Sequence, residues 1–367
     1  MHLYIHVPFC ARRCSYCDFA IAVRRDVPSE RFADLVLREW AGWQSHAVWS
    51  RSPRISTLYF GGGTPSRLAP EAIARITEQV WIDRGMERGA EITLEANPDD
   101  VTPAAVEGWR AAGVNRVSLG AQSFDPAVLR WMHRTHDPRQ IGRAVELIRA
   151  AGIGELSLDL IFGLPGILER DWPADLDQVL TLQPDHLSLY GLTIEARTPL
   201  ARWAARGAVT PVDDDRYAAE FLVAHERLAS AGYEHYEVSN YARAGRRARH
   251  NSAYWQRAPY IGLGPSAHSA MDDERRWNQR EWAAYERRLD EGAPVVEGEE
   301  RLGPQEIRLE ELYLGLRTVG GLAAERIPAE TTDRWIGSGW ATRAEGRIRL
   351  TPEGWLRLDA LVASVSG

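Results

Sequence analysis

Three cysteines lie within eight residues near the start of the chain, and the other 364 of its 367 residues include no further cysteine. Cys10, Cys14 and Cys17 follow the spacing C-x3-C-x2-C. Three thiolates on one short loop can hold three irons of a [4Fe–4S] cube and leave the fourth iron without a protein ligand. Such an open iron is where chemistry can occur, so these residues predict an iron–sulfur site that reacts with a small molecule.

Two other interpretations of the cysteines stay open at this stage. They could be inert buried thiols, because free cysteine is often buried. They could also bind zinc, which in structural sites takes four Cys or His ligands, with His6 as the fourth. An odd number of cysteines in one tight motif argues against a disulfide framework and indicates a reducing compartment. We therefore expect a cytoplasmic protein.

Composition excludes several functional classes. Hydrophobic residues make up 44% of the chain and charged residues 26%, which is typical of a soluble protein with a sizeable core. The net charge of −7 gives no basic footprint for nucleic acid. All 44 basic residues are arginine, which excludes a Schiff-base or P-loop lysine. We expect no signal or transit peptide and no membrane span, which leaves peripheral membrane contact open.

A glycine run and several polar residues stand at the ends of predicted strands. The segment Gly-Gly-Gly-Thr-Pro at 61–65 lets a backbone approach a ligand closely and offers N–H groups to a carboxylate or phosphate. Glu95 ends one further apolar strand, Gln122 follows another and Asp159 lies within a third, where an unpaired charged group is costly. Arg134 can pair with a carboxylate bidentately. Together these residues predict a ligand cradle, although each alone could be a satisfied interior polar group.

The elements that must position these residues alternate along the first two thirds of the chain. Strands are expected at 3–7, 56–60, 91–95, 116–120, 156–162 and 186–192. Helices are expected at 29–43, 70–81, 103–112, 126–132, 139–151 and 172–181. This alternation predicts βαβ units and a parallel sheet, either doubly wound or curled toward a barrel. The polar residues fall near the carboxyl ends of the strands, where barrel enzymes carry their active sites.

The pattern changes near residue 213, and we divide the chain into 1–212, a barrel-closing extension at 213–302, and a small domain at 303–367. A helix at 216–231 precedes a tyrosine-rich, loop-rich stretch, and 291–303 has the composition of a linker. A helix at 304–319 and a helix, hairpin and helix over 335–360 suggest a winged-helix-like module. No basic recognition stripe is evident there, so we interpret it as a lid or packing domain.

At this point the motifs are specific enough to resemble a known family. The segment Tyr-Ile-His-Val-Pro-Phe-Cys at 4–10, the cysteine spacing, the glycine run and the strand ends resemble a radical S-adenosylmethionine (SAM) protein. More narrowly, they resemble the oxygen-independent coproporphyrinogen III oxidase (dehydrogenase) family and its relative, the HemW family of heme chaperones. The resemblance implies an α/β fold, a partial (β/α)6 barrel with a smaller C-terminal α+β domain. In such proteins the open iron binds SAM, and one electron cleaves it to a 5′-deoxyadenosyl radical.

The resemblance also assigns roles to residues, none of them catalytic. The [4Fe–4S] ligands are Cys10, Cys14 and Cys17. The SAM contacts are Tyr4, Tyr16, Gly62, Gly63, Thr64, Glu95, Gln122, Arg134 and Asp159, with Thr193 and His268 on further adenosine-side positions. Glycine N–H groups and a guanidinium suit the methionyl carboxylate of SAM, whereas side-chain carboxylates suit its amino group and ribose hydroxyls.

Three departures favour the chaperone branch over the dehydrogenase. Phe19 stands where the dehydrogenase has a fourth cysteine, two residues after Cys17. The dehydrogenase carries an N-terminal extension, for which the residues before the first strand leave no room. The segment His-Asn-Ser-Ala-Tyr-Trp at 250–255 matches the H-N-x-x-Y-W motif of HemW-like proteins. Segments 192–195 and 236–241 are also similar to the chaperones.

The motif makes His250 a candidate heme ligand, with Tyr254 and Trp255 facing the porphyrin, because a neutral imidazole can ligate heme iron. The alternative is a histidine that only forms hydrogen bonds. Our hypothesis is a heme chaperone that delivers heme to acceptor hemoproteins, without coproporphyrinogen dehydrogenase activity. The rivals are a radical SAM enzyme that decarboxylates or methylates a tetrapyrrole, and an unrelated iron–sulfur barrel. A homodimer formed through the cluster face stays open.

Overall fold

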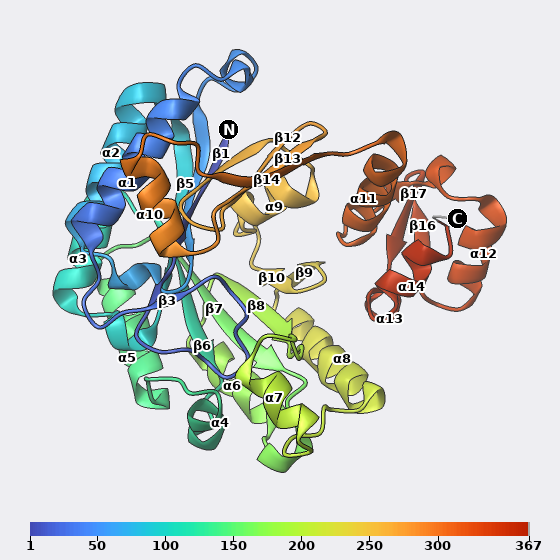
Figure 1. Cartoon of the computed structure of the whole chain (residues 1–367). Coiled ribbons are helices and arrows are strands. Elements are labelled where there is room, and N and C mark those ends of the chain that lie inside the picture. Colours follow the sequence, from blue (N-terminus) through green and yellow to red (C-terminus); the bar gives the residue numbers. More distant parts are fainter. Residues whose placement is uncertain (366–367) are drawn as a thin grey trace.

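The computed structural model describes residues 1–365, and one large mixed sheet forms its centre (Figure 1). The strands β11, β1, β4, β5, β6, β7 and β8 lie in this order and run parallel. Their bounds are β1 (His2–Val7), β4 (Ile55–Gly62), β5 (Met86–Ala96), β6 (Arg116–Gln122), β7 (Glu155–Phe162), β8 (His186–Gly191) and β11 (Tyr260–Leu263). The predicted strands are confirmed, and β11 adds a parallel strand that the sequence did not reveal.

Helices follow these strands, and most of them cover the outer face of the sheet, whereas α4 and α7 lie at the end of the barrel near the cysteine loop (Figure 1). They are α1 (Ser29–Trp43), α2 (Pro70–Arg84), α3 (Pro103–Ala111), α4 (Pro126–Trp131), α5 (Pro138–Ala150), α6 (Trp172–Thr181), α7 (Pro199–Ala205) and α8 (Asp214–Ser230). Proline begins α3, α4 and α5, and the preceding Thr102, Asp125 and Asp137 accept hydrogen bonds from the first-turn N–H groups. Fixed φ and a side-chain acceptor together define where a helix starts, so the predicted starts were accurate.

Alternation along the strands separates a dry outer face from a polar concave face. In β1, Leu3 and Ile5 are fully buried in the hydrophobic core, whereas the alternate residues His2 and Tyr4 contact polar and aromatic side chains of β4. Successive strand residues point to opposite faces, so the concave face collects the polar positions of every strand. Together with the six βα units, this arrangement is the expected partial (β/α)6 barrel.

Antiparallel strands extend both edges of the parallel sheet. Strands β10 (Asn240–Ala242) and β9 (Glu234–Glu237) follow β8, while β12 (His268–Met271), β13 (Glu274–Asn278) and β14 (Val296–Arg301) follow β11. The predicted linker at 291–303 is therefore wrong. Charged residues fill β14 because it is an edge strand whose side chains are mostly exposed.

A buried carboxylate connects the β12–β13 edge to the outer helices. Glu39 of α1 accepts hydrogen bonds from Gly264 N–H at 2.8 Å, Asn278 Nδ2 at 2.6 Å and Tyr285 Oη at 2.7 Å. Tyr285 belongs to α10 (Trp282–Asp290). Burial raises the pKa of Glu39 to about 7. This cluster fixes the turn that leads into β12.

The C-terminal residues form a smaller α+β unit beside the barrel (Figure 1). It contains α11 (Pro304–Leu316), β15 (Leu322–Ala323), α12 (Ala329–Gly337), β16 (Ala341–Ala344), β17 (Arg347–Leu350), α13 (Pro352–Trp355) and α14 (Leu358–Ala363). The expected helix, hairpin and helix are confirmed. Arg317 Nε lies 2.8 Å from Glu237 Oε2 of β9, which joins the unit to the barrel. No helix within residues 1–365 is both long enough and apolar enough to cross a membrane.

Candidate cofactor site

The three cysteines lie on a loop that a short parallel pair holds at its base. Strand β2 (Phe9–Cys10) pairs with β3 (Ala22–Val23). The loop is also bound to distant parts of the chain, since Ser15 N–H donates to Met132 O at 3.3 Å and Leu200 N–H donates to Ser15 O at 2.9 Å. The cysteines are thus presented just beyond the carboxyl end of β1.

Two side chains donate hydrogen bonds to cysteine sulfurs. Thr64 Oγ1 lies 3.4 Å from Cys10 Sγ, and Arg134 Nη1 lies 3.7 Å from Cys14 Sγ. Burial raises the pKa of Cys10 and raises the pKa of Cys17 to about 11. The Cys10 and Cys17 thiols therefore hold their protons until a metal displaces them. Once a metal has replaced these protons, the hydrogen bonds from Thr64 and Arg134 stabilise the metal-bound thiolates.

A cavity of about 350 Å³ opens beside the cysteines, within the size range of small-molecule sites. It lies at the carboxyl ends of β4 to β8, as expected. The structure brings most of the predicted residues to this cavity. They are Cys10, Cys14, Cys17, Tyr16, Gly62, Gly63, Thr64, Glu95, Gln122, Arg134, Asp159 and Thr193. We call it the cysteine cavity.

Arg134 supplies the positive charge of the cysteine cavity. Its Nη2 donates to Asn97 Oδ1 at 2.6 Å and to Gly120 O at 2.9 Å. Its Nε is buried without a hydrogen-bond partner. An unpaired buried donor costs about 1–3 kcal/mol. An anionic ligand group beside this guanidinium would accept a hydrogen bond from Nε and remove that cost.

The glycines serve close packing rather than ligand binding through their N–H groups. Gly62 has φ +111°, and a Cβ there would lie 2.6 Å from the His6 ring. Its N–H donates to Glu95 Oε2 at 3.0 Å, while Gly63 N–H donates to Val7 O at 2.7 Å. The expectation that these two N–H groups bind a ligand carboxylate is wrong for this structure, because the protein already uses both of them.

Two carboxylates face the cysteine cavity from alternate strands. Glu95 of β5 accepts from Tyr59 Oη at 2.8 Å, and burial raises its pKa to about 7. Asp159 of β7 accepts from Ser118 Oγ at 2.9 Å, and burial raises its pKa as well. Two desolvated carboxylates favour a ligand that brings a positive charge and hydroxyl donors.

A break in the β6 register directs Gln122 into the cavity. The pairing with β7 shifts between Gly120 and Gln122, and Gln122 has φ +66°. Such a bulge re-aims one side chain. Sequence reasoning missed several lining residues, namely Tyr59, Asn97, Ser118, His133 and Tyr190. Asn97 follows Glu95 by two residues at a strand end, so the same signal could have found it.

Tyr4 and His268 are not at the cysteine cavity. Both line a second cavity of about 340 Å³, together with Phe19, Tyr254 and Tyr260. The separation arises because β1 and β12 lie on the opposite side of β4 from the strands β5, β6 and β7, which carry Glu95, Gln122 and Asp159. Phe19 lines both cavities and is 57% exposed.

The zinc interpretation fails because His6 is engaged elsewhere. Its Nε2 bonds Ala20 O at 2.9 Å and its Nδ1 bonds Tyr4 Oη at 3.1 Å. No three His, Cys, Asp or Glu side chains within residues 1–365 are grouped to hold a single metal ion. Cysteines that bind different irons of one cube do not need such a grouping, since each binds its own iron.

His250 is buried at the amino end of the barrel. It belongs to α9 (Arg249–Trp255) and is 1% exposed. Its Nδ1 bonds Thr57 Oγ1 at 2.7 Å and its Nε2 bonds Tyr254 Oη at 2.7 Å. Burial lowers the pKa of His250 to about 3. Both ring nitrogens are occupied, so heme ligation by His250 is not supported in this arrangement, and the hydrogen-bonding alternative describes it.

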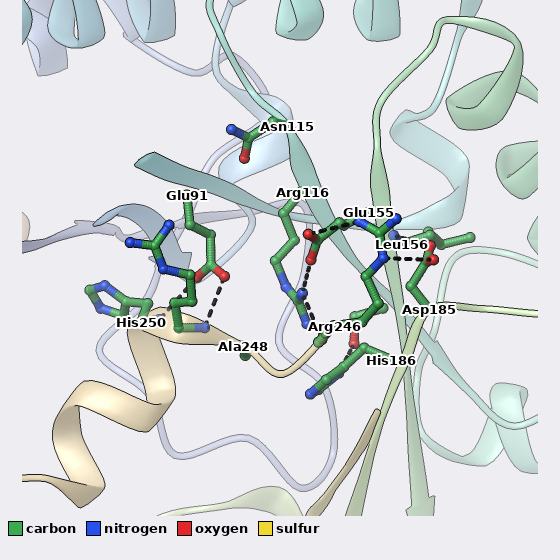
Figure 2. Close-up of polar contacts among 12 residues, drawn as sticks. Glu91, Asn115, Arg116, Glu155, Leu156, Asp185, His186, Arg246, Ala248 and His250 are labelled. Atoms are coloured by element: carbon green, nitrogen blue, oxygen red, sulfur yellow. Dashed lines mark hydrogen bonds and ion pairs between the residues drawn. The ribbon is translucent and has the colours of Figure 1, made fainter. Parts of the chain in front are cut away.

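Figure 2 shows how the segment before His250 is held against the barrel. Glu91 of β5 accepts from the N–H groups of Arg249 and His250, both at 2.9 Å. Arg116 Nη1 lies 2.6 Å from Glu155, which also pairs with Arg246 at 3.1 Å. Trp255, at the other end of α9, lines a cavity of about 650 Å³ against the C-terminal unit. The motif therefore closes the barrel floor.

The cysteine cavity fits the cofactors that its residue types suggest. Three sulfurs, one guanidinium with an unpaired donor and two desolvated carboxylates suit a [4Fe–4S] cluster beside a ligand bearing a carboxylate, an amine and hydroxyls. Such a cluster with an open iron supplies one electron to a bound sulfonium compound. The residues of the chain would bind, orient and partly desolvate these two groups.

This fold and this cavity define a radical SAM protein, and the profile of the Radical SAM superfamily matches residues 4–179. A solved structure of coproporphyrinogen III oxidase (HemN) from Escherichia coli aligns with a TM-score of 0.80. It covers 98% of this chain and 88% of that one at 22% identity, which shows a shared fold.

Two curated relatives narrow the assignment. Heme chaperone HemW of Synechocystis sp. is 37% identical over 337 residues, covering 89% of this chain and 80% of that protein. Heme chaperone HemW of Mycobacterium tuberculosis is 36% identical over 371 residues, covering 100% and 94%. The chain belongs to the HemW family.

Proposed function

We propose that this protein is a cytoplasmic heme chaperone that binds heme and delivers it to acceptor hemoproteins. The observation that carries the proposal is the likeness along the whole chain to proteins named heme chaperone HemW. The H-N-x-x-Y-W segment is part of the barrel floor, because Glu91 of β5 binds the backbone N–H groups of Arg249 and His250.

We further propose that the cysteine cavity carries the [4Fe–4S] cluster and SAM. Cys10, Cys14 and Cys17 would hold the cluster, and Arg134 would pair with the SAM carboxylate. Glu95 and Asp159 would accept from its amino group and ribose hydroxyls, and Gln122, Thr193 and Tyr16 would contact the adenosine side. The unpaired Arg134 Nε and the raised pKa values of both carboxylates support this division of charge.

A second candidate function is a radical SAM enzyme that acts on a tetrapyrrole, such as a coproporphyrinogen III dehydrogenase. The shared fold with coproporphyrinogen III oxidase favours it. Phe19 argues against it, because it replaces the fourth cysteine of the dehydrogenase motif and presents an exposed apolar ring at the cavity mouth.

A paired experiment on cluster-loaded protein separates the two functions. Under anaerobic conditions, the protein is titrated with heme, and a separate sample is incubated with SAM, reductant and coproporphyrinogen III. The proposal predicts a stoichiometric shift of the Soret band and no protoporphyrinogen above the level of a Cys17→Ala control. Absence of a Soret shift, or protoporphyrinogen formation that requires Cys17, would contradict it.

A further inference from the structure

The second cavity carries side chains that the cysteine cavity does not need. It lies across Phe19 from the cluster loop, on the β1–β11–β12 side of the sheet. Tyr4, Tyr254 and Tyr260 give it aromatic walls, and the rings of Tyr254 and Tyr260 meet edge to face with centroids 4.6 Å apart. Its remaining lining includes two imidazoles, those of His6 and His268, and one guanidinium, that of Arg280, with Asp18 beside it.

His268 differs from His2, His6 and His250 because no hydrogen bond engages its ring nitrogens within the described residues. His2 bonds Thr57, while His6 and His250 use both ring nitrogens. The His268 ring stacks on Trp277 with centroids 6.0 Å apart. His268 is solvent-exposed, and partial burial lowers its pKa. A neutral imidazole with a free lone pair is a metal ligand.

The other walls match the rest of a heme molecule. Heme is a large apolar plane that bears two carboxylates, and its iron accepts an axial ligand. Burial raises the pKa of Tyr254 and Tyr260, so both remain uncharged phenols that suit a ring face and do not compete as phenolate ligands. Arg280 Nη2 donates to Asp18 O at 2.9 Å, which holds the guanidinium at the rim, where a carboxylate can reach it.

We propose that the second cavity binds heme, with His268 as the axial ligand of the iron, Tyr254 and Tyr260 against the porphyrin, and Arg280 facing a propionate. This inference rests on the proposed function, because it names the heme site of the proposed chaperone. It also gives His250 a role: its Nε2 holds the Tyr254 hydroxyl at 2.7 Å and thereby orients that ring toward the cavity. His250 is then a positioning residue.

His133 is the rival ligand that the structure itself offers. Its ring lines the cysteine cavity, packs on Trp203 with centroids 5.5 Å apart, and forms no hydrogen bond within the described residues. The cysteine cavity, however, is lined by the charged groups proposed to bind SAM. Heme at His133 would compete with SAM, whereas heme at His268 leaves the cysteine cavity free.

The test is a hemin titration of the full cluster-loaded chain, followed by its Soret band. Wild-type protein, His268→Ala and His133→Ala are compared, each with and without saturating SAM. We expect His268→Ala to lose the histidine-ligated spectrum and to bind hemin at least about tenfold more weakly. We expect His133→Ala to match wild type, SAM to leave the wild-type affinity unchanged, and added imidazole to restore the ligated spectrum of His268→Ala.

The outcomes separate the two proposals. If wild-type protein gives no Soret shift, the proposed function fails and this site fails with it. If wild type binds hemin and His268→Ala binds it with the same spectrum and affinity, only the His268 site is overturned. Loss of the spectrum in His133→Ala, competition by SAM, or failure of imidazole to rescue His268→Ala would overturn it as well.

Discussion

Replacing Glu91 by glutamine should loosen α9 selectively, because this carboxylate anchors the first residues of the helix. Glu91 is 6% exposed and accepts two backbone hydrogen bonds, from Arg249 N–H and His250 N–H, each at 2.9 Å. Glutamine keeps one carbonyl oxygen and turns its amide toward the second N–H group. One of the two backbone N–H groups then loses its acceptor, and the other keeps an acceptor that is no longer charged.

The expected cost follows from these two contacts. A hydrogen bond to a charged group contributes about 1.5–3 kcal/mol, so the loss of one bond and the weakening of the other should cost about 2–3 kcal/mol. Glu87 on the same strand is a matched control. Its carboxylate lies 3.8 Å from Arg249 Nη2, with the two side chains 47% and 48% exposed. An exposed ion pair contributes at most about 1 kcal/mol, so Glu87→Gln should be nearly silent.

Hydrogen exchange measures the effect at the affected helix. In Glu91→Gln, exchange of the amides of 249–255 should accelerate at least roughly 30-fold, since 1.4 kcal/mol corresponds to a factor of ten. Exchange in the C-terminal unit should stay unchanged. If Glu91→Gln and Glu87→Gln exchange at the same rate, the carboxylate does not anchor α9 and the account of the barrel floor is wrong.

Three further predictions concern stability and the cofactor site. Because the pKa of Glu39 rises from 4.5 to about 7 on folding, its contribution is present below pH 4.5 and is lost as pH rises through 7. The free energy of unfolding in urea, taken as wild type minus Glu39→Gln, should therefore fall by about 3 kcal/mol between pH 4.5 and pH 8. A difference that does not change with pH would contradict this. Gly62→Ala should lower the iron bound per chain, because positive φ costs about 1–3 kcal/mol and the new Cβ meets the His6 ring; full iron loading would refute it. Arg134→Lys should weaken SAM binding about tenfold by calorimetry of samples matched for iron content, since it loses a charge-assisted contact of about 1.5 kcal/mol; equal affinity would show that Arg134 does not bind the SAM carboxylate.

The sequence predicted those features whose signals are local. The strand–helix alternation, the proline helix starts after Asp125 and Asp137, and the cysteine spacing each depend on residues close together in the chain. The location of the cysteine cavity could be predicted because the carboxyl ends of parallel strands meet at one edge of the sheet. The residues gathered there come from seven separate segments, and most of them follow or end a strand, whereas Arg134 follows the helix α4 and Asp159 lies within β7.

The errors arose where sequence-distant segments meet. No residue near His250 in the sequence indicates that His250 forms hydrogen bonds with Thr57 and Glu91 at the barrel floor, since these partners are 193 and 159 residues away in the chain. Likewise, nothing local shows that the register of β12 turns His268 into a different cavity from Arg134. The charged composition of β14 concealed a strand, because an edge strand exposes most of its side chains.

Heme transfer tests the central claim most directly. Cluster-loaded protein carrying one heme is mixed with an apo-hemoprotein, and the acceptor spectrum is followed against the same amount of heme held by a non-specific carrier such as albumin. The account predicts that the acceptor fills faster from this protein than from the carrier. It also predicts that filling from His268→Ala is no faster than from the carrier. Equal rates from wild-type protein and carrier would contradict the claim that this HemW-family protein delivers heme.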